Sequence, residues 1–415
     1  MKRPSPWLML VVLLLGLLLV REPRFAQVED FFLRWLLKHS VAARAPVPLT
    51  VVEIGQDPLM TPGPANEAPP FAGQAQSAGA SAISPLEFAL FLQSVLEFQP
   101  GVVAFENVLK WRERDRDQEQ VFLDQAMRVP KLLLAAELGH VTDPDAPWTE
   151  IRGFQQVTGK RGELASFSGV ARQPAEDLRL ISTVGYTNLP EDSSSKIRVP
   201  LLFLYRGEVI PSFTLQAILL WLGVTPADVQ VVLGSHIALP QDRRIPIRAD
   251  GTVLVDPNAA KRARRLSFNE LLLAAQKRDT GEAAANGEVP LDISEQVVLA
   301  RTPATPFSAP DLFAATIATV QSNRYLRRIT VLFDCAVLLL IGAVAGMLPR
   351  IERLDLFLCG IAFTAAYCLL TLGMLSRWEI WVPGVLPIGA AWIAIVAALI
   401  LRKKAESILI PPPVV

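Results

Sequence analysis

Four long runs of apolar residues separate a long, more polar middle region from the two ends of the chain. The runs are Trp7–Val20, Ile329–Leu348, Leu356–Leu375 and Ile380–Leu401. About 20 apolar residues in a helix cross the roughly 30 Å hydrocarbon core of a membrane, because a helix satisfies its own backbone hydrogen bonds. The pattern therefore predicts four transmembrane helices, one N-terminal and three C-terminal.

The first run resembles a secretory signal peptide, because Lys2 and Arg3 precede it. The residues after it read Arg-Glu-Pro-Arg-Phe-Ala and contain no small-x-small cleavage site. We therefore expect an uncleaved signal-anchor helix over residues 1–24.

Basic residues flank the apolar runs on both sides of the membrane in nearly equal number, so the positive-inside rule orients the chain only weakly. A short basic N-terminal flank followed by a long translocated domain is the commoner arrangement. The Ser376–Val382 loop, with Arg377 offset by Glu379, agrees with it. We expect both termini in the cytoplasm and the middle region outside it.

Several residues in the C-terminal runs bear on their function. Asp334 lies about one turn into the second run, where it can reach interfacial water or a neighbouring span, and an ionisable group at such a depth is a candidate for signalling. Trp378 and Trp381 stand where an aromatic belt is expected. Pro383 and Pro387 mark either the start of the last helix or a kink in it.

Strand and helix patterns alternate between the apolar runs, which predicts an α/β domain with a mixed sheet flanked by helices over residues 25–328. Leu49–Ile54, Gly101–Phe105 and Leu132–Ala136 are short buried strands with helical patterns between them. Ser84-Pro85-Leu86-Glu87 predicts a helix start, and Asp117 is expected to cap the next helix. This run predicts parallel strands joined by right-handed crossovers.

Other segments complete the predicted domain. A helix over Phe25–Arg44 carries an apolar stripe that the domain or a partner copy is expected to cover, and a helix over Asp311–Val320 is expected to lead toward the second span. Ser267 begins a capping box. The remaining predictions are hairpins at Arg206-Gly207 and Asp250-Gly251, helix Phe213–Leu222, strand Gln296–Leu299, and loops Thr61–Ser84 and Asp279–Glu288. The stripe consists of Val28, Phe32, Trp35 and Leu36.

Composition supports a membrane protein and excludes several functions. The chain has 415 residues, of which 51% are hydrophobic, and a mean hydropathy of +0.34. Its 40 basic and 40 acidic residues leave no net charge to attract nucleic acid. Cys335, Cys359 and Cys368 all lie in apolar runs, so the middle domain has neither a disulfide nor a thiol nucleophile.

The sequence offers little catalytic or metal-binding chemistry. His39, His140 and His236 lack a second ligand at helical spacing, which argues against zinc. Asp115, Asp117 and Glu119 alternate with arginines and read as a solvated helix start rather than a calcium loop. No phosphate-binding glycine loop and no Gly-x-Ser-x-Gly motif occurs. We therefore expect no enzyme, cofactor or metal. The basic run Lys261–Arg265 is either a solvated turn or a site for an anionic ligand or lipid headgroups.

Five phrases of the sequence carry a resemblance to a known family. The phrases are Val51–Leu59, Gly101–Glu106, Gly185–Asn188 with Asp192, Arg198–Leu201, and Val297–Leu299 followed by Pro310. They resemble the second type of CHASE domain, the extracellular sensory module of bacterial adenylate cyclases, histidine kinases, serine/threonine kinases and diguanylate cyclases. Gly55, Glu106, Ser84-Pro85 and Ala300 depart from the family pattern.

The resemblance implies an anchor over residues 1–24, a sensory domain over 25–328, three spans over 329–401 and a short cytoplasmic tail over 402–415. The tail is too short for a catalytic domain, so the expected partner is a separate kinase or cyclase chain, besides the membrane, a small-molecule or envelope signal, and a second copy. The implied location is the bacterial inner membrane. The alternative is a structural or interaction protein of the envelope. Candidate ligand-binding residues are Asp57, Glu106, Asn107, Asp192 and Arg198.

Overall fold

A computed structural model divides the chain into two compact units. One unit is Arg44–Tyr325, and the other combines Met1–Ala43 with Leu326–Val415. The predicted anchor Trp7–Val20 and nearly all of the predicted loop Thr61–Ser84 lie outside the described residues. The structure describes residues 23–40, 45–55, 83–111, 115–140, 152–190, 197–240, 242–280, 291–302, 309–345 and 353–409.

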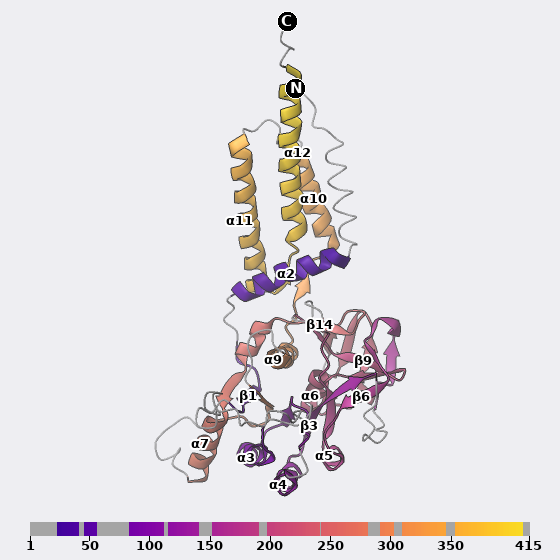
Figure 1. The fold of residues 1–415 in the computed structure, drawn as a ribbon, viewed down its shortest axis with the longest axis vertical. Coiled ribbons are helices and arrows are strands. Elements are labelled where there is room, and N and C mark those ends of the chain that lie inside the picture. Colours follow the sequence, from indigo (N-terminus) through magenta and orange to yellow (C-terminus); the bar gives the residue numbers. More distant parts are fainter. Residues whose placement is uncertain are drawn as a thin grey trace, which may run out of the picture. The chain divides into compact units, whose positions relative to one another are not determined.

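A seven-stranded mixed sheet forms the centre of the first unit within the described residues, with the order β15-β1-β16-β2-β3-β6 and with β7 also paired to β3. Of these strands, β1, β3 and β6 are labelled in Figure 1. Neighbouring strands are parallel except for the antiparallel pair β3–β6. The mixed sheet is as predicted. The strands are β1 (Leu49–Glu53), β2 (Val102–Phe105), β3 (Leu132–Gly139), β6 (Gly169–Arg172), β7 (Thr183–Tyr186), β15 (Arg264–Ser267) and β16 (Val297–Arg301).

Helices cover both faces of this sheet, because side chains of successive strand residues point to opposite faces and both sets are apolar. Val51 and Leu299 pack in one buried cluster with side chains of α6 and α9, whereas Val52 and Val298 pack in another with α3, α4 and α7. The helices are α3 (Pro85–Leu96), α4 (Arg116–Ala126), α6 (Phe213–Leu222), α7 (Phe268–Asp279) and α9 (Ala309–Gln321).

Capping residues in the sequence predicted the starts of α3 and α7 correctly. The Ser84 hydroxyl accepts a hydrogen bond from the Glu87 amide at 3.2 Å, and Ser267 and Glu270 form the predicted capping box. The prediction that Asp117 caps a helix is wrong, because α4 begins at Arg116 and Asp117 lies in its first turn. Helix α9 ends at Gln321, so it does not itself continue into the second apolar run.

One of the two predicted hairpins is present. Strands β9 (Leu202–Tyr205) and β10 (Glu208–Pro211) pair around Arg206-Gly207. The second prediction is wrong, because β13 (Arg243–Pro246) pairs with β12 (His236–Leu239), whereas β14 (Thr252–Leu254) pairs with β8 (Arg198–Pro200). Gly251, at a positive φ of 73°, does make a turn, but the strands on its two sides diverge to different partners.

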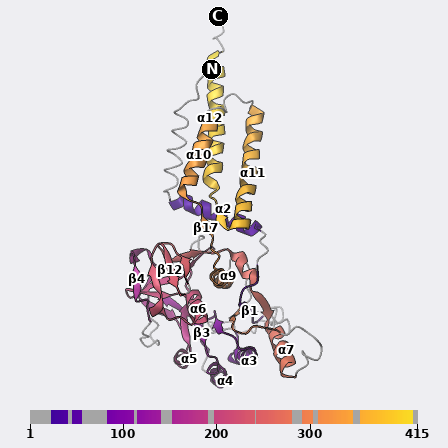
Figure 2. The ribbon, with the colours of Figure 1, turned by 180° about the vertical axis from the view of Figure 1, so that it is seen from behind.

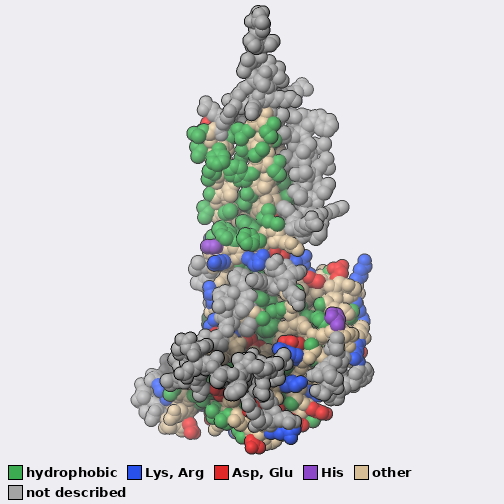
Figure 3. Space-filling view, in the orientation of Figure 1, with side chains coloured by type: hydrophobic (Ala, Val, Ile, Leu, Met, Phe, Trp, Pro, Cys, Tyr) green, Lys and Arg blue, Asp and Glu red, His purple; other side chains and the backbone are tan. Residues whose placement is uncertain are grey.

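The second unit contains three long helices with α2 lying crosswise at one end of them (Figures 1 and 2). Hydrophobic side chains cover the visible surface of the long helices (Figure 3). Among the described residues, Leu354–Trp378 is the one helix that is both long and apolar enough to cross a membrane. The elements are α2 (Pro23–His39), α10 (Val331–Ala345), α11 (Arg353–Trp378), α12 (Val385–Leu409), β17 (Arg327–Arg328) and β18 (Ile380–Trp381).

Helix α2 packs against α11 and α12, and not against the α/β domain that was one of the two predicted partners of its apolar stripe. The Glu29 carboxylate accepts hydrogen bonds from the backbone amides of Gly384 at 3.2 Å and Leu386 at 3.1 Å. This buried contact caps the start of α12 and sets the rotation of α2. The predicted apolar stripe is therefore only partly right, since Leu36 is buried and Phe32 half-buried, whereas Val28 and Trp35 are exposed. The other buried leucines of α2 are Leu33 and Leu37.

Arg328 links the short β17–β18 ladder to α10. Its Nη2 lies 3.3 Å from the Asp334 carboxylate, and its guanidinium lies 5.4 Å from the centre of the Trp381 ring. The predicted role of Trp381 in an aromatic belt is wrong, because the side chain is 4% exposed, whereas Trp378 is exposed. Pro383 precedes α12 and Pro387 lies in its first turn, so the prolines mark the start of that helix.

Candidate functional site

The connection that follows β16 leads to the opposite face of the sheet from the connections that follow its two neighbouring strands, β1 and β2. After β1 and β2 the next helices are α3 and α4, which pack on one face, but after β16 the next helix is α9, which packs on the other. In open α/β sheets, connections that diverge in this way leave a crevice at the carboxyl ends of the strands, and ligands bind there. This edge is therefore the first place to look for a site.

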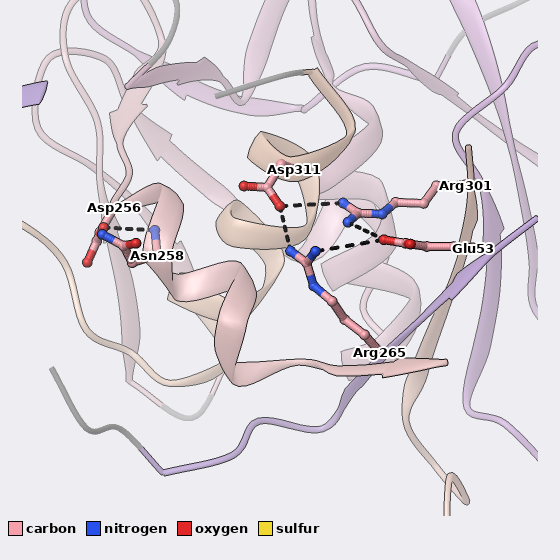
Figure 4. Close-up of polar contacts among 6 residues, drawn as sticks. All are labelled: Glu53, Asp256, Asn258, Arg265, Arg301 and Asp311. Carbon is pink, nitrogen blue, oxygen red and sulfur yellow. Dashed lines mark hydrogen bonds and ion pairs between the residues drawn. The ribbon is translucent and has the colours of Figure 1, made fainter. Parts of the chain in front are cut away.

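Charged side chains gather at this edge, and we call Glu53, Glu106, Arg265, Arg301 and Asp311 the carboxyl-edge cluster. Glu53 and Arg301 are the last residues of β1 and β16, Arg265 lies on β15, and Asp311 lies in the first turn of α9. Figure 4 shows four of them converging in front of α9. The Asp256 carboxylate drawn nearby instead accepts the Asn258 amide at 2.9 Å and caps a short 3₁₀-helix.

Four members of the cluster form a closed set of ion pairs. Arg301 lies 3.1 Å from Glu53 and 3.7 Å from Asp311. Arg265 lies 2.7 Å from Asp311 and 3.7 Å from Glu53. The Arg301 side chain is 0% exposed, which ordinarily makes a charge costly to bury unless its partners surround it. The arrangement therefore depends on all four groups being present.

Strand alternation explains why these groups share one face. Glu53 follows Val51 by two residues and Arg301 follows Leu299 by two, and both apolar residues face α9. Arg265 pairs in register with Val51, so it faces the same way. An aspartate in the first turn of a helix is also favoured by the helix dipole, which accounts for Asp311.

Glu106 is the fifth member of the cluster, and it takes no part in the ion pairs that join the other four. It directly follows β2, its amide donates to the Ala300 carbonyl at 3.3 Å, and the residue is 7% exposed. Neither carboxyl oxygen has a hydrogen-bond partner in the part of the chain that the structure describes. Burial raises the pKa of Glu106 well above its usual value, and the nearby charges of Glu53 and Asp311 add to the rise.

Neighbouring groups lower the pKa values of Glu106 and Asp311 and so oppose the effect of burial. Arg301 and the backbone amide of Thr302 lower the pKa of Glu106, although less than burial raises it. Burial also raises the pKa of Asp311, against the opposing charges of Arg265 and Arg301. The cluster thus holds a carboxyl that keeps its proton to a higher pH than in water.

Replacing Glu106 by glutamine is expected to change how stability depends on pH. Since the folded state binds the Glu106 proton more tightly than the unfolded state, the contribution of Glu106 to wild-type stability falls as pH rises from about 4.5 through the folded pKa. Within that window the wild type is expected to lose about 1.4 kcal/mol per pH unit relative to Glu106→Gln. Thermal unfolding of both proteins across this pH range measures the difference.

The comparison isolates Glu106 because Asp311 titrates in both proteins. Glu163→Gln, a change at an exposed position, serves as the control and should follow the wild-type curve. Parallel curves for wild type and Glu106→Gln would show that Glu106 is ionised in the folded state and would contradict the prediction.

The predicted site residues are only partly brought together. Glu106 belongs to the cluster, and Asn107 follows it and is half-buried. Arg198 lies on β8, in a two-stranded ladder with β14 and not on the central sheet. Asp57 and Asp192 lie outside the described residues.

Four members of the cluster were missed by sequence reasoning. The predicted strand Gln296–Leu299 ended before Arg301, although the structure extends it to that residue. The basic run Lys261–Arg265 was interpreted as a solvated turn or a site for an anionic ligand or lipid headgroups, whereas Arg265 lies on an edge strand and is ion-paired within the protein. The sequence did contain a signal for these residues, because Glu53 and Arg301 are charged residues that each end an apolar strand.

Gly185 and Asn188, from the family-like sequence Gly185–Asn188, have structural roles in the central sheet. A Cβ atom on Gly185 would lie 2.8 Å from the Phe213 Cα, so only glycine lets α6 approach β7 this closely. The Asn188 side chain accepts from the Leu138 amide at 2.8 Å and donates to the Leu138 carbonyl at 2.9 Å, which completes the end of β3. These residues build the sheet that carries the cluster.

Within the described ranges, no group of three or more His, Cys, Asp and Glu side chains is arranged to hold a metal ion. A family model described as CHASE2 domain matches residues 9–321. No curated protein and no solved structure matches the chain.

Proposed function

The chain belongs to the CHASE2 domain family, and from this premise we propose that it is a membrane-anchored receptor whose extracytoplasmic domain senses a signal at the carboxyl-edge cluster. CHASE2 domains are extracellular sensory domains rather than catalytic ones. The family match carries this proposal. The divergent connections around β16 support the choice of site, because they lie where α/β sheets bind ligands.

Four membrane spans are part of the proposal. The length and apolar character of Leu354–Trp378 support a span at α11. Helix α10 and the Val385–Ile400 part of α12 are shorter but apolar, and they pack as neighbours. The N-terminal run Trp7–Val20 would supply the fourth span. A separate kinase or cyclase chain and a second copy of this chain stay predicted partners.

Reporter insertion into the full chain tests the location of the domain. A reporter active only in the periplasm and one active only in the cytoplasm are each inserted after Thr280, where α7 has ended. We expect the periplasmic reporter alone to be active. The same reporters placed after Arg402 are the matched control and should give the reverse result. Cytoplasmic activity at Thr280 would refute the receptor.

A further inference from the structure

Charge balance sets Glu106 apart from the rest of the carboxyl-edge cluster. Arg265 and Arg301 each contact both Glu53 and Asp311, so two positive and two negative groups neutralise one another. An ionised Glu106 would add one uncompensated negative charge to this buried set. The fifth carboxyl has no cation of its own among the described residues.

Hydrogen bonding sets Glu106 apart as well. Among the residues that the structure describes, both of its carboxyl oxygens are buried without a hydrogen-bond partner, and so is the Nε atom of Arg301, the guanidinium whose charge acts on Glu106. Buried polar groups are nearly always hydrogen-bonded, so an unpartnered carboxyl and an unpartnered guanidinium nitrogen at the same edge of the sheet are exceptions that call for a functional explanation. The two groups lie at the ends of β2 and β16, the strands whose connections diverge.

We propose that the carboxyl-edge cluster binds a small organic molecule carrying a protonated amine with a neighbouring oxygen, in which the ammonium group pairs with Glu106 and the oxygen accepts from Arg301. This inference deepens the proposed sensor function and rests on it. One positive charge brings the cluster with an ionised Glu106 to neutrality. A ligand that is only an anion would instead meet three carboxylates and two guanidiniums that are already ion-paired.

Proton competition follows from this assignment. The ammonium group binds the ionised form of Glu106, so ligand affinity rises with pH up to the folded pKa of that carboxyl, which burial raises. The other charged groups that act on Glu106 are Glu53 from β1, Arg301 from β16 and Asp311 from α9.

Ethanolamine is the test ligand, and ethylene glycol, in which a hydroxyl replaces the ammonium group, is its matched control. The full chain is placed in phosphatidylglycerol nanodiscs in phosphate buffer, so that neither lipid nor buffer supplies an ammonium group. We expect saturating ethanolamine to raise the melting temperature by about 5 °C and to bind more tightly as pH rises. Glu106→Gln should weaken binding at least about tenfold, whereas Glu163→Gln should not.

Three outcomes would overturn the ligand class: no response to ethanolamine, an equal response to ethylene glycol, or a response that survives Glu106→Gln. A response to acetate alone would show an anion site instead. These results leave the reporter experiment untouched, so failure of the ligand class is distinguishable from failure of the receptor itself. A shift that disappears only in Glu106→Gln supports the proposal.

Discussion

Arg301→Met is expected to lower the free energy of unfolding of the α/β unit by about 3–5 kcal/mol. The side chain is fully buried, and its removal leaves Glu53, Asp311 and Glu106 without the guanidinium that lies among them. Removing one partner of a buried ion pair costs more than the pair itself contributes, because an uncompensated charge stays buried. Urea unfolding of the full chain in nanodiscs measures the loss.

Arg265→Met is the matched control, since Arg265 contacts the same two carboxylates from a side chain that is 40% exposed. Water screens this position, so its loss is expected to cost only about 1 kcal/mol. Equal costs at the two arginines would mean that solvent reaches Arg301 as well, and the description of a buried pairing would be wrong.

Phe105→Ala is expected to cost a similar amount, about 3–5 kcal/mol, through a different mechanism. Phe105 is the last residue of β2, and its ring centre lies 5.2 Å from that of Phe88, 5.4 Å from Phe91 and 5.9 Å from Phe122. These rings join β2 to α3 and α4, so truncation leaves a cavity that rigid neighbours cannot fill. Thermal and urea unfolding of the full chain measure the cost.

Phe105→Leu keeps most of the volume and is expected to cost about half as much as alanine. Phe105 and Glu106 are adjacent in the chain but belong to opposite faces of the sheet. Leucine should therefore leave the pH dependence that Glu106 causes in place. A loss below about 1 kcal/mol for alanine would contradict the observed packing.

The helices and most strands of the α/β unit were predictable because their signals are local. Short continuous runs of apolar residues marked β1, β2 and β3, and cap residues marked the starts of α3 and α7. Helix Phe213–Leu222 was predicted with the bounds that the structure shows. Each of these signals involves residues only a few positions apart, so no knowledge of the partner strands was needed.

Strand order and the candidate site were not predictable in the same way. The insertion of β16 between β1 and β2 pairs it with residues 248 positions earlier in β1 and 195 positions earlier in β2, and no local pattern specifies these neighbours. The same is true of α2, because the contact of Glu29 with the start of α12 joins residues more than 350 positions apart. Even the turn at Gly251 did not show that its flanking strands pair elsewhere.

By itself, the sequence determined the alternation of helices and strands, the apolar runs, the family resemblance and the choice of Glu106 as a candidate site residue. All of these depend on periodicity, caps and motifs, which involve residues that are close together in the chain. Only the tertiary structure decided that Glu53, Arg265, Arg301 and Asp311 pair with one another at the edge of the sheet where that carboxyl lies. Their convergence depends on which strands become neighbours and on which face the chain leaves β16, and long-range packing determines both.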